Sequence, residues 1–210
     1  LTDADMELCD LQAAFCGTSC GDTGAGHRAI GEIGMSGIPI VNVENACSSG
    51  SSAFRLAYQA IATELYDTVL AVGIDRIPPQ GFLPSSFWPE WERAMGFNVQ
   101  PANYALKTVR YMEETDATVR DFDRVAVKNR RNGALNPNAL FQKEISIEDV
   151  AKSRMIARPL RLLHCCPIAQ GGAAIILSSL DKIKSNSKLI AVAASVLTSG
   201  MYGAYTTTGD

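Results

Sequence analysis

The feature that most constrains the fold is a regular alternation of strand-like and helix-like runs between residues 10 and 75. Residues 10–15, 39–43 and 68–74 are short and largely apolar, which predicts buried strands. Between them, apolar residues recur at helical spacing over residues 23–35 and 48–65, which predicts two helices. Strands that alternate with helices pair in parallel, so we expect an α/β fold with helices covering a sheet.

The middle of the chain has a different character. Residues 76–101 contain five prolines and both tryptophans with little periodicity, which is typical of a packed irregular excursion. Beyond it, the pattern predicts helices over 103–114, 119–132 and 147–153, and then strands over 171–178 and 189–196.

Composition excludes several classes of protein. The 210 residues are 47% hydrophobic and 20% charged, with a net charge of −3, as in ordinary globular domains and not in nucleic-acid-binding ones. No apolar run reaches the 18 residues of a membrane span, and the first residues do not resemble a signal peptide, so we expect a cytoplasmic protein. The one basic cluster, Lys128 with Arg130 and Arg131, fits either a solvated helix face or a contact with a phosphate-bearing ligand.

Six cysteines raise the question of disulfides or a metal site. Three residues separate Cys16 from Cys20, and Cys165 adjoins Cys166, so neither pair has the spacing of a zinc ribbon. A chain of this length and hydrophobicity needs no stapling. Reduced thiols and no bound metal are therefore expected.

Cys47 stands out because it falls where a predicted strand gives way to a predicted helix. Unpaired N–H groups and the macrodipole at a helix N-terminus favour a thiolate, which is the nucleophilic form of cysteine. The alternative is a buried structural cysteine, the usual fate of a thiol outside a disulfide. Position alone leaves both interpretations open.

Five collinear segments resemble the thiolase superfamily, most of all the sterol-carrier-protein type and the related acetyl-CoA acetyltransferases of bacteria and archaea. The resemblance runs from about residue 10 to residue 179. The segments are Ala13-Ala14-Phe15-Cys16-Gly17, the nucleophile-like Val43-Glu44-Asn45-Ala46-Cys47-Ser48-Ser49-Gly50-Ser51-Ser52-Ala53, Ala71-Val72-Gly73-Ile74-Asp75, residues 125–139, and Cys166-Pro167-Ile168-Ala169-Gln170-Gly171-Gly172-Ala173-Ala174.

The resemblance implies a thiolase-like fold of αβαβα layers, of which this chain would supply the N-terminal half with an inserted loop domain. Residues 1–80 and 165–180 would form the core, residues 81–164 the loop or cap insertion, and residues 181–210 the start of the C-terminal half. A first strand and helix before residue 10, and nearly all of the second half, are not in the sequence. The chain is therefore expected to be a piece of a longer protein.

The family resemblance also implies an activity. Thiolases are acyl-CoA C-acyltransferases that cleave a 3-oxoacyl-CoA with coenzyme A through an S-acyl-cysteine, or run the Claisen condensation in reverse. One alternative is a thiolase-fold aldolase, a retro-aldol lyase acting on a 3-hydroxyacyl-CoA with a small OB-fold/zinc-ribbon partner. Another is a catalytically silent subunit that binds acyl-CoA.

By the same resemblance, Cys47 is the catalytic nucleophile, and Met95, Cys166 and Pro167 line the substrate and coenzyme A channel. The family's catalytic histidine and second cysteine belong to its second half, so His27 and His164 are expected to be structural. Coenzyme A enters as a substrate, with no permanently bound cofactor. The resemblance also implies a homodimer in which residues 40–43 pair across a two-fold axis.

Overall fold

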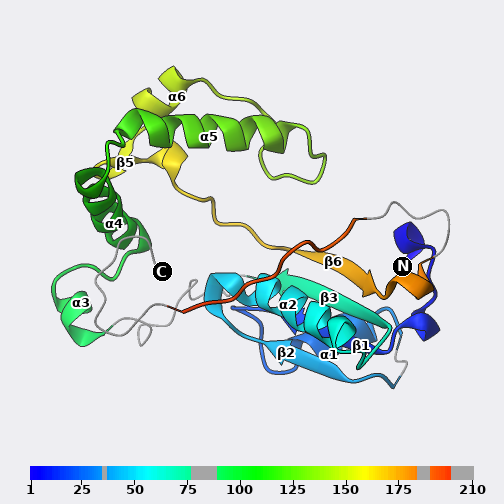
Figure 1. Cartoon of the computed structure of the whole chain (residues 1–210). Coiled ribbons are helices and arrows are strands. Elements are labelled where there is room, and N and C mark those ends of the chain that lie inside the picture. The colour runs from blue at the N-terminus through cyan, green and yellow to red at the C-terminus, as the bar shows by residue number, and fades with distance from the viewer. Residues whose placement is uncertain (35–36, 77–88, 184–189, 200–210) are drawn as a thin grey trace. The chain divides into compact units, whose positions relative to one another are not determined.

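The computed structural model describes residues 1–34, 37–76, 89–183 and 190–199. They divide into two compact units, drawn in Figure 1. Unit 1 contains the described parts of 1–83 and 170–198, and unit 2 contains the described parts of 84–169 together with Ser199.

Unit 1 is built on a four-stranded sheet in the order β2-β1-β3-β6. The strands are β1 (Ala13–Gly17), β2 (Ile40–Val43), β3 (Thr68–Asp75) and β6 (Gly171–Ser178). Strand β1 pairs in parallel with β2 and with β3, whereas β6 runs antiparallel to β3 along its whole length, from Thr68 opposite Ser178 to Asp75 opposite Gly171. The predicted parallel sheet is confirmed, and β6 makes it a mixed one.

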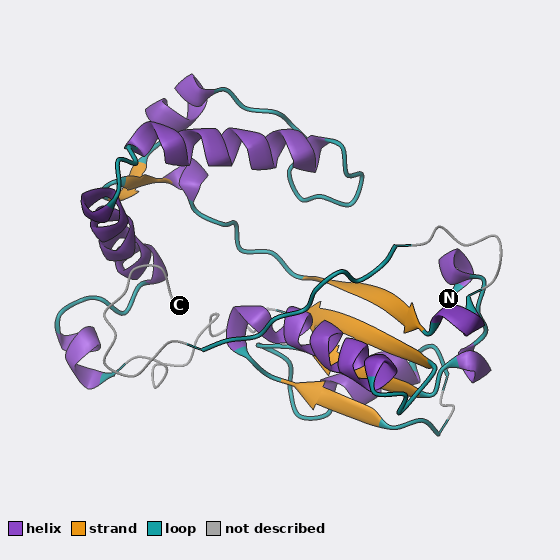
Figure 2. Cartoon of the chain, in the orientation of Figure 1, coloured by secondary structure: helices purple, strands orange, loops and turns teal. Residues whose placement is uncertain are grey.

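Two helices cover opposite faces of this sheet, as Figure 2 shows. Helix α2 (Ser49–Ala62) packs its alanine-rich side on one face, in a core that includes Ala57, Val69 and Leu177. The shorter α1 (Ala25–Gly31) covers the other face, where Ile30 contacts a cluster with Leu70. Small residues on α2 let the helix lie close to the strands.

Short 3-10 turns complete unit 1. They are η1 (Thr2–Ala4) and η2 (Leu8–Asp10) before the sheet, η3 (Ala46–Ser48) before α2, and η6 (Leu180–Lys182) after β6. The sequence predicted a strand over 189–196. Residues 190–196 are irregular, so the prediction is wrong there, and residue 189 lies outside the described residues. The last residues of this segment lie along α2 instead, where the Ser195 carbonyl accepts a hydrogen bond from Arg55 and Val192 packs on the core.

Unit 2 is mainly helical. Its helices are α3 (Glu90–Ala94), α4 (Gln100–Glu114), α5 (Val119–Ala134) and α6 (Ile147–Lys152), followed by a small hairpin of β4 (Met155–Ala157) and β5 (Leu160–Arg161) and the turn η5 (Leu162–His164). Helix α4 begins three residues before the predicted start because Pro101 fits the first turn of a helix. Capping boxes at Thr118 and Ser146 fix the starts of α5 and α6.

No helix among the described residues combines the length and the apolar character that crossing a bilayer requires.

Candidate active site

Cys47 lies in unit 1, in the turn η3 that joins the end of β2 to the start of α2. Cys47 is an exposed residue, so its neighbours in unit 1 do not bury the thiol. The preceding residue, Ala46, has a φ of 44°, in the left-handed region that a residue with a Cβ seldom adopts. Such conformations persist only where the surroundings hold them, and they cluster at functional sites.

The surroundings that hold this turn are a set of hydrogen bonds from its own neighbours. The Ser49 hydroxyl accepts from the Asn45 N–H at 2.9 Å and donates to the Ala46 carbonyl at 2.7 Å. The Asn45 side-chain amide donates to Ser52 at 2.9 Å, and the Ala46 N–H donates to a Glu44 carboxylate oxygen at 2.7 Å. The serines and the asparagine around Cys47 therefore fix the turn, a role that the sequence did not reveal.

Close backbone packing seats the start of α2 at the carboxyl ends of the parallel strands. A Cβ placed on Gly17, the last residue of β1, would lie 2.2 Å from the Ser49 carbonyl oxygen. At the next residue, a Cβ placed on Gly50 would meet the Gly73 Cα of β3 at an ordinary contact distance of 3.8 Å. The edge formed by the carboxyl ends of the strands is where open α/β sheets bind their ligands. Cys47 is therefore presented at the functional edge of the sheet.

Asp75, the last residue of β3, is a second feature of this edge that sequence reasoning missed. Burial alone would raise its pKa, but hydrogen bonds from Cys20, Ser19 and Thr18 outweigh burial and hold the pKa below its ordinary value. The carboxylate thus stays ionised at neutral pH. The only available sequence signal was an acidic residue at the end of a strand.

Nearby, Cys16 of β1 is buried, and burial together with the charge of Asp75 raises the pKa of its thiol. Cys16 is therefore a protonated, structural cysteine, in contrast to exposed Cys47. All six cysteines lie in the described residues, and none of them forms a disulfide. Within the described ranges, no group of three or more His, Cys, Asp or Glu residues is arranged to hold a metal ion.

The other three predicted site residues belong to unit 2. Met95, just after α3, is 62% exposed, and Cys166 and Pro167 lie on the exposed segment that follows η5. The neighbouring Cys165 is half-buried. The pKa of its thiol is raised mainly by burial and, to a smaller extent, by the nearby Cys166. The three predicted residues belong to a different unit from Cys47, and their roles stay predictions.

His164 is structural, as the sequence indicated. Its Nε2 lies 2.8 Å from Asp123 of α5, and the two side chains are only 4% and 8% exposed. Its Nδ1 accepts the backbone N–H of Arg161 at 3.0 Å, so the proton of the neutral ring is on Nε2 and is donated to Asp123. Both nitrogens are used and the ring is buried. His27, by contrast, is exposed on α1 with Asn42 beside its Nδ1.

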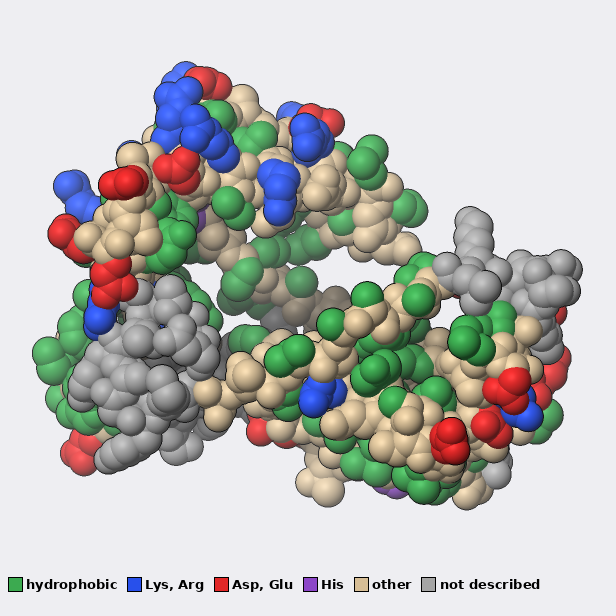
Figure 3. Space-filling view, viewed as in Figure 1, with side chains coloured by type: hydrophobic (Ala, Val, Ile, Leu, Met, Phe, Trp, Pro, Cys, Tyr) green, Lys and Arg blue, Asp and Glu red, His purple; other side chains and the backbone are tan. Residues whose placement is uncertain are grey.

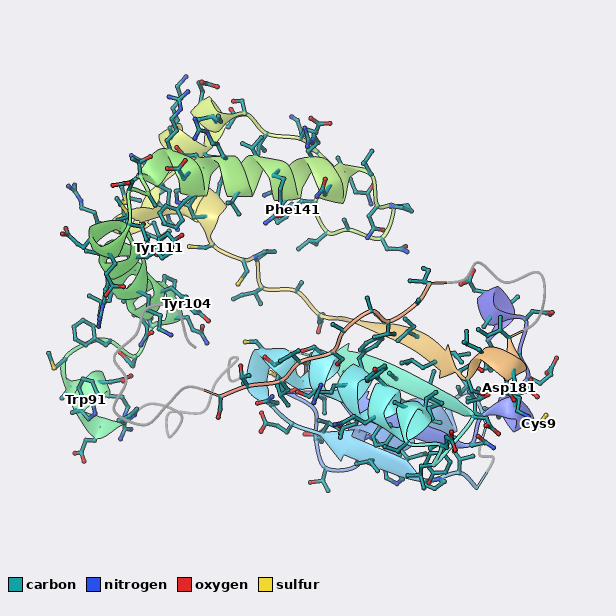
Figure 4. The ribbon with its side chains drawn as sticks, in the orientation of Figure 1. Cys9, Trp91, Tyr104, Tyr111, Phe141 and Asp181 are labelled. Atoms are coloured by element: carbon teal, nitrogen blue, oxygen red, sulfur yellow. The ribbon has the colours of Figure 1, made fainter. Side chains whose placement is uncertain are left out.

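The basic cluster lies on α5, where Lys128 and Arg131 are exposed beside Arg120 and Arg124. Figure 3 shows basic side chains gathered over this helix. Arg130 differs, because its guanidinium stacks 3.8 Å from the centre of the Phe141 ring, labelled in Figure 4. The cluster is thus a cationic helix face plus one arginine engaged in packing.

The arrangement in unit 1 defines a class of protein: an α/β domain that displays a cysteine at a helix start beside the carboxyl ends of its strands. No family model matches the chain. It is 38% identical to the benzoylsuccinyl-CoA thiolase subunit BbsB of Thauera aromatica over 91% of the chain and 51% of that protein. It is 34% identical to an acetyl-CoA acetyltransferase of Methanothermobacter thermautotrophicus over 86% of the chain and 49% of that protein.

Among solved structures, the chain resembles the Ltp2-ChsH2(DUF35) aldolase, with a TM-score of 0.70 and 30% identity over 86% of the chain and 48% of that one. The chain belongs to the thiolase superfamily, and it has the thiolase-like fold that its sequence predicts. It spans about half the length of the thiolase-type relatives it matches.

Proposed function

We propose that the protein containing this chain is a thiolase-type acyltransferase in which Cys47 is the nucleophile. The thiolate attacks the 3-oxo carbon of a 3-oxoacyl-CoA, and a carbon–sulfur bond forms as the carbon–carbon bond breaks. The electron pair of the broken bond passes to the departing acyl-CoA, which takes up a proton. Coenzyme A then attacks the acyl-enzyme and restores the cysteine; the Claisen direction reverses these steps.

The observation that carries this proposal is the geometry of the Cys47 turn. An exposed thiol follows a residue held at positive φ, two residues before the start of α2. A cysteine kept only for packing would be buried, as Cys16 is. The family resemblance places the acid/base histidine and second cysteine of the reaction in the other half of a thiolase.

Coenzyme A binding is proposed for unit 2. Met95, Cys166 and Pro167 are exposed there, as residues that contact a ligand must be before it binds. Lys128 and Arg131 offer cations for phosphate groups on the same unit. Under this proposal coenzyme A is a substrate that comes and goes, and no permanent cofactor is required.

A homodimer is part of the proposal. Strand β2 is an edge of the sheet, and its Val41 is 44% exposed, so the backbone of residues 40–43 is open to pairing with a second copy. A cytoplasmic location is proposed with it. Light scattering on the full-length protein tests the dimer, and a monomer at micromolar concentration contradicts it.

A second candidate function is a retro-aldol carbon–carbon lyase. It is favoured by the likeness to the Ltp2-ChsH2(DUF35) aldolase at 30% identity. In that case the full-length protein would work with a small OB-fold/zinc-ribbon subunit, and Cys47 would not be the nucleophile. The third hypothesis is a catalytically silent subunit that binds acyl-CoA.

The variant Cys47→Ser separates these functions in the full-length protein. A thiolase loses about 10³-fold or more of its activity on 3-oxoacyl-CoA with this change. An aldolase retains release of an aldehyde or ketone from a 3-hydroxyacyl-CoA, which would refute the acyl-transfer proposal. Cys9→Ser is the matched control, because Cys9 is also exposed in unit 1 but lies in η2.

A further inference from the structure

The carboxylate of Asp75 is held by the loop that follows β1. Its Oδ1 accepts from the Thr18 hydroxyl at 2.8 Å, the Ser19 N–H at 3.0 Å and the Cys20 N–H at 2.7 Å. Its Oδ2 accepts from the Ser19 hydroxyl at 2.8 Å and more weakly from the Ser19 N–H at 3.3 Å. Both oxygens are therefore occupied by donors from three consecutive residues, 55 to 57 positions away in sequence.

The same loop contacts the strand that leads into the Cys47 turn. The Thr18 N–H donates to the carbonyl of Val43 at 3.0 Å, at the end of β2 and three residues before the turn begins. Gly17 lies against the backbone of Ser49, where the turn passes into α2. Thr18 itself is buried, and its hydroxyl both donates to Asp75 and accepts the N–H of Gly21 at 2.8 Å. Asp75 is thus linked through Thr18 to Val43, the last strand residue before the turn.

We propose that Asp75 is a positioning residue for Cys47: by fixing the loop of residues 18–20, it sets where Val43 leads into the turn that presents the thiol. The role favours a carboxylate, because both of its oxygens accept from backbone N–H groups, which can only donate. An asparagine would turn an NH₂ group toward one set of contacts, and the N–H groups in that set would lose their acceptor, whereas the hydroxyls could reverse direction. The catalytic consequence rests on the proposed acyl transfer, but the effect on the thiol does not.

The test is Asp75→Asn in the full-length protein, with Asp181→Asn as the matched control. Asp181 is also in unit 1 but is 70% exposed in η6. The readout is the rate at which iodoacetamide alkylates Cys47, mapped by mass spectrometry and divided by the rate at exposed Cys9. We expect the ratio to fall at least threefold in Asp75→Asn and to stay unchanged in the control, because a displaced turn no longer presents the exposed thiol of Cys47 to the reagent in the same way.

A second variant covers the case in which Asp75→Asn does not fold. Thr18→Val keeps the shape of the side chain but removes the hydroxyl that joins Asp75 to the loop, and we expect a smaller fall in the same ratio. In acyl-transfer assays both variants should lower kcat at least tenfold with less than a twofold change in KM for coenzyme A.

An unchanged alkylation ratio in a folded variant overturns the positioning role, whatever its stability. A wild-type protein with no acyl-transfer activity refutes the proposed function instead. In that case the alkylation ratio still decides the role of Asp75.

Discussion

Replacing Gly17 by alanine tests the close packing that places α2 and the Cys47 turn. The new Cβ would lie 2.2 Å from the Ser49 carbonyl oxygen and 2.6 Å from the Gly50 nitrogen, whereas ordinary contacts begin at 3.4 Å. Because these neighbours are backbone atoms, the start of α2 must retreat by roughly 1 Å, and overpacking of this kind costs about 1–3 kcal/mol or more. We therefore expect a loss of stability of that size.

The assay is urea unfolding of the full-length protein together with hydrogen exchange of residues 46–55. Gly17→Ala should lower the unfolding midpoint and speed exchange at the start of α2. Gly50→Ala is the matched control, because its Cβ would meet only the Gly73 Cα at 3.8 Å and alanine is the better helix former. Equal effects of the two variants, or no effect of Gly17→Ala, would refute the packing argument.

Two further predictions concern buried or ionised groups. Asp123→Ala leaves His164 without its buried partner and should destabilise unit 2 by about 3 kcal/mol, seen as faster hydrogen exchange in α5. The control is Arg110→Ala, which removes one partner of an exposed ion pair and should change stability by less than about 1 kcal/mol. Equal effects of the two variants would contradict the structural role of His164. Because the pKa of Asp75 is lowered on folding, its contribution to stability is present above the ordinary carboxyl pKa of 3.8 and is lost as the pH falls through the folded-state value. Unfolding curves between pH 3 and pH 6 should therefore differ less between wild type and Asp75→Asn at the acid end, and a constant difference would count against this linkage.

Much of unit 1 could be predicted because its signals are local. The alternation of residues 10–75 predicted three strands and two helices, and the helical spacing of the apolar residues in α2 predicted Cys47 just before the helix, which begins two residues later at Ser49. The apolar run over 189–196 led to a wrong prediction of a strand, because a strand also needs the edge of a sheet to pair with. In the described residues 190–196 the segment packs beside α2 instead of pairing.

The residues that fix the site could not be predicted in the same way. Asp75 meets its loop across more than 50 positions, and His164 meets Asp123 across 41. Such pairs depend on how strands and helices come together in three dimensions, which one sequence does not show. The hydrogen bonds of Asn45 and Ser49 are local, but they accompany a left-handed backbone conformation at Ala46. An alanine in the sequence gives no indication of such a conformation.

The proposed function depends on acylation of Cys47. To detect it, the full-length protein is mixed with a 3-oxoacyl-CoA and quenched within seconds, and the acyl mass is mapped by peptide mass spectrometry. We expect one acyl group on the peptide that contains Cys47, removed again when coenzyme A is added. Substrate turnover with an unmodified Cys47, or an acyl group that accumulates on another cysteine, would contradict it.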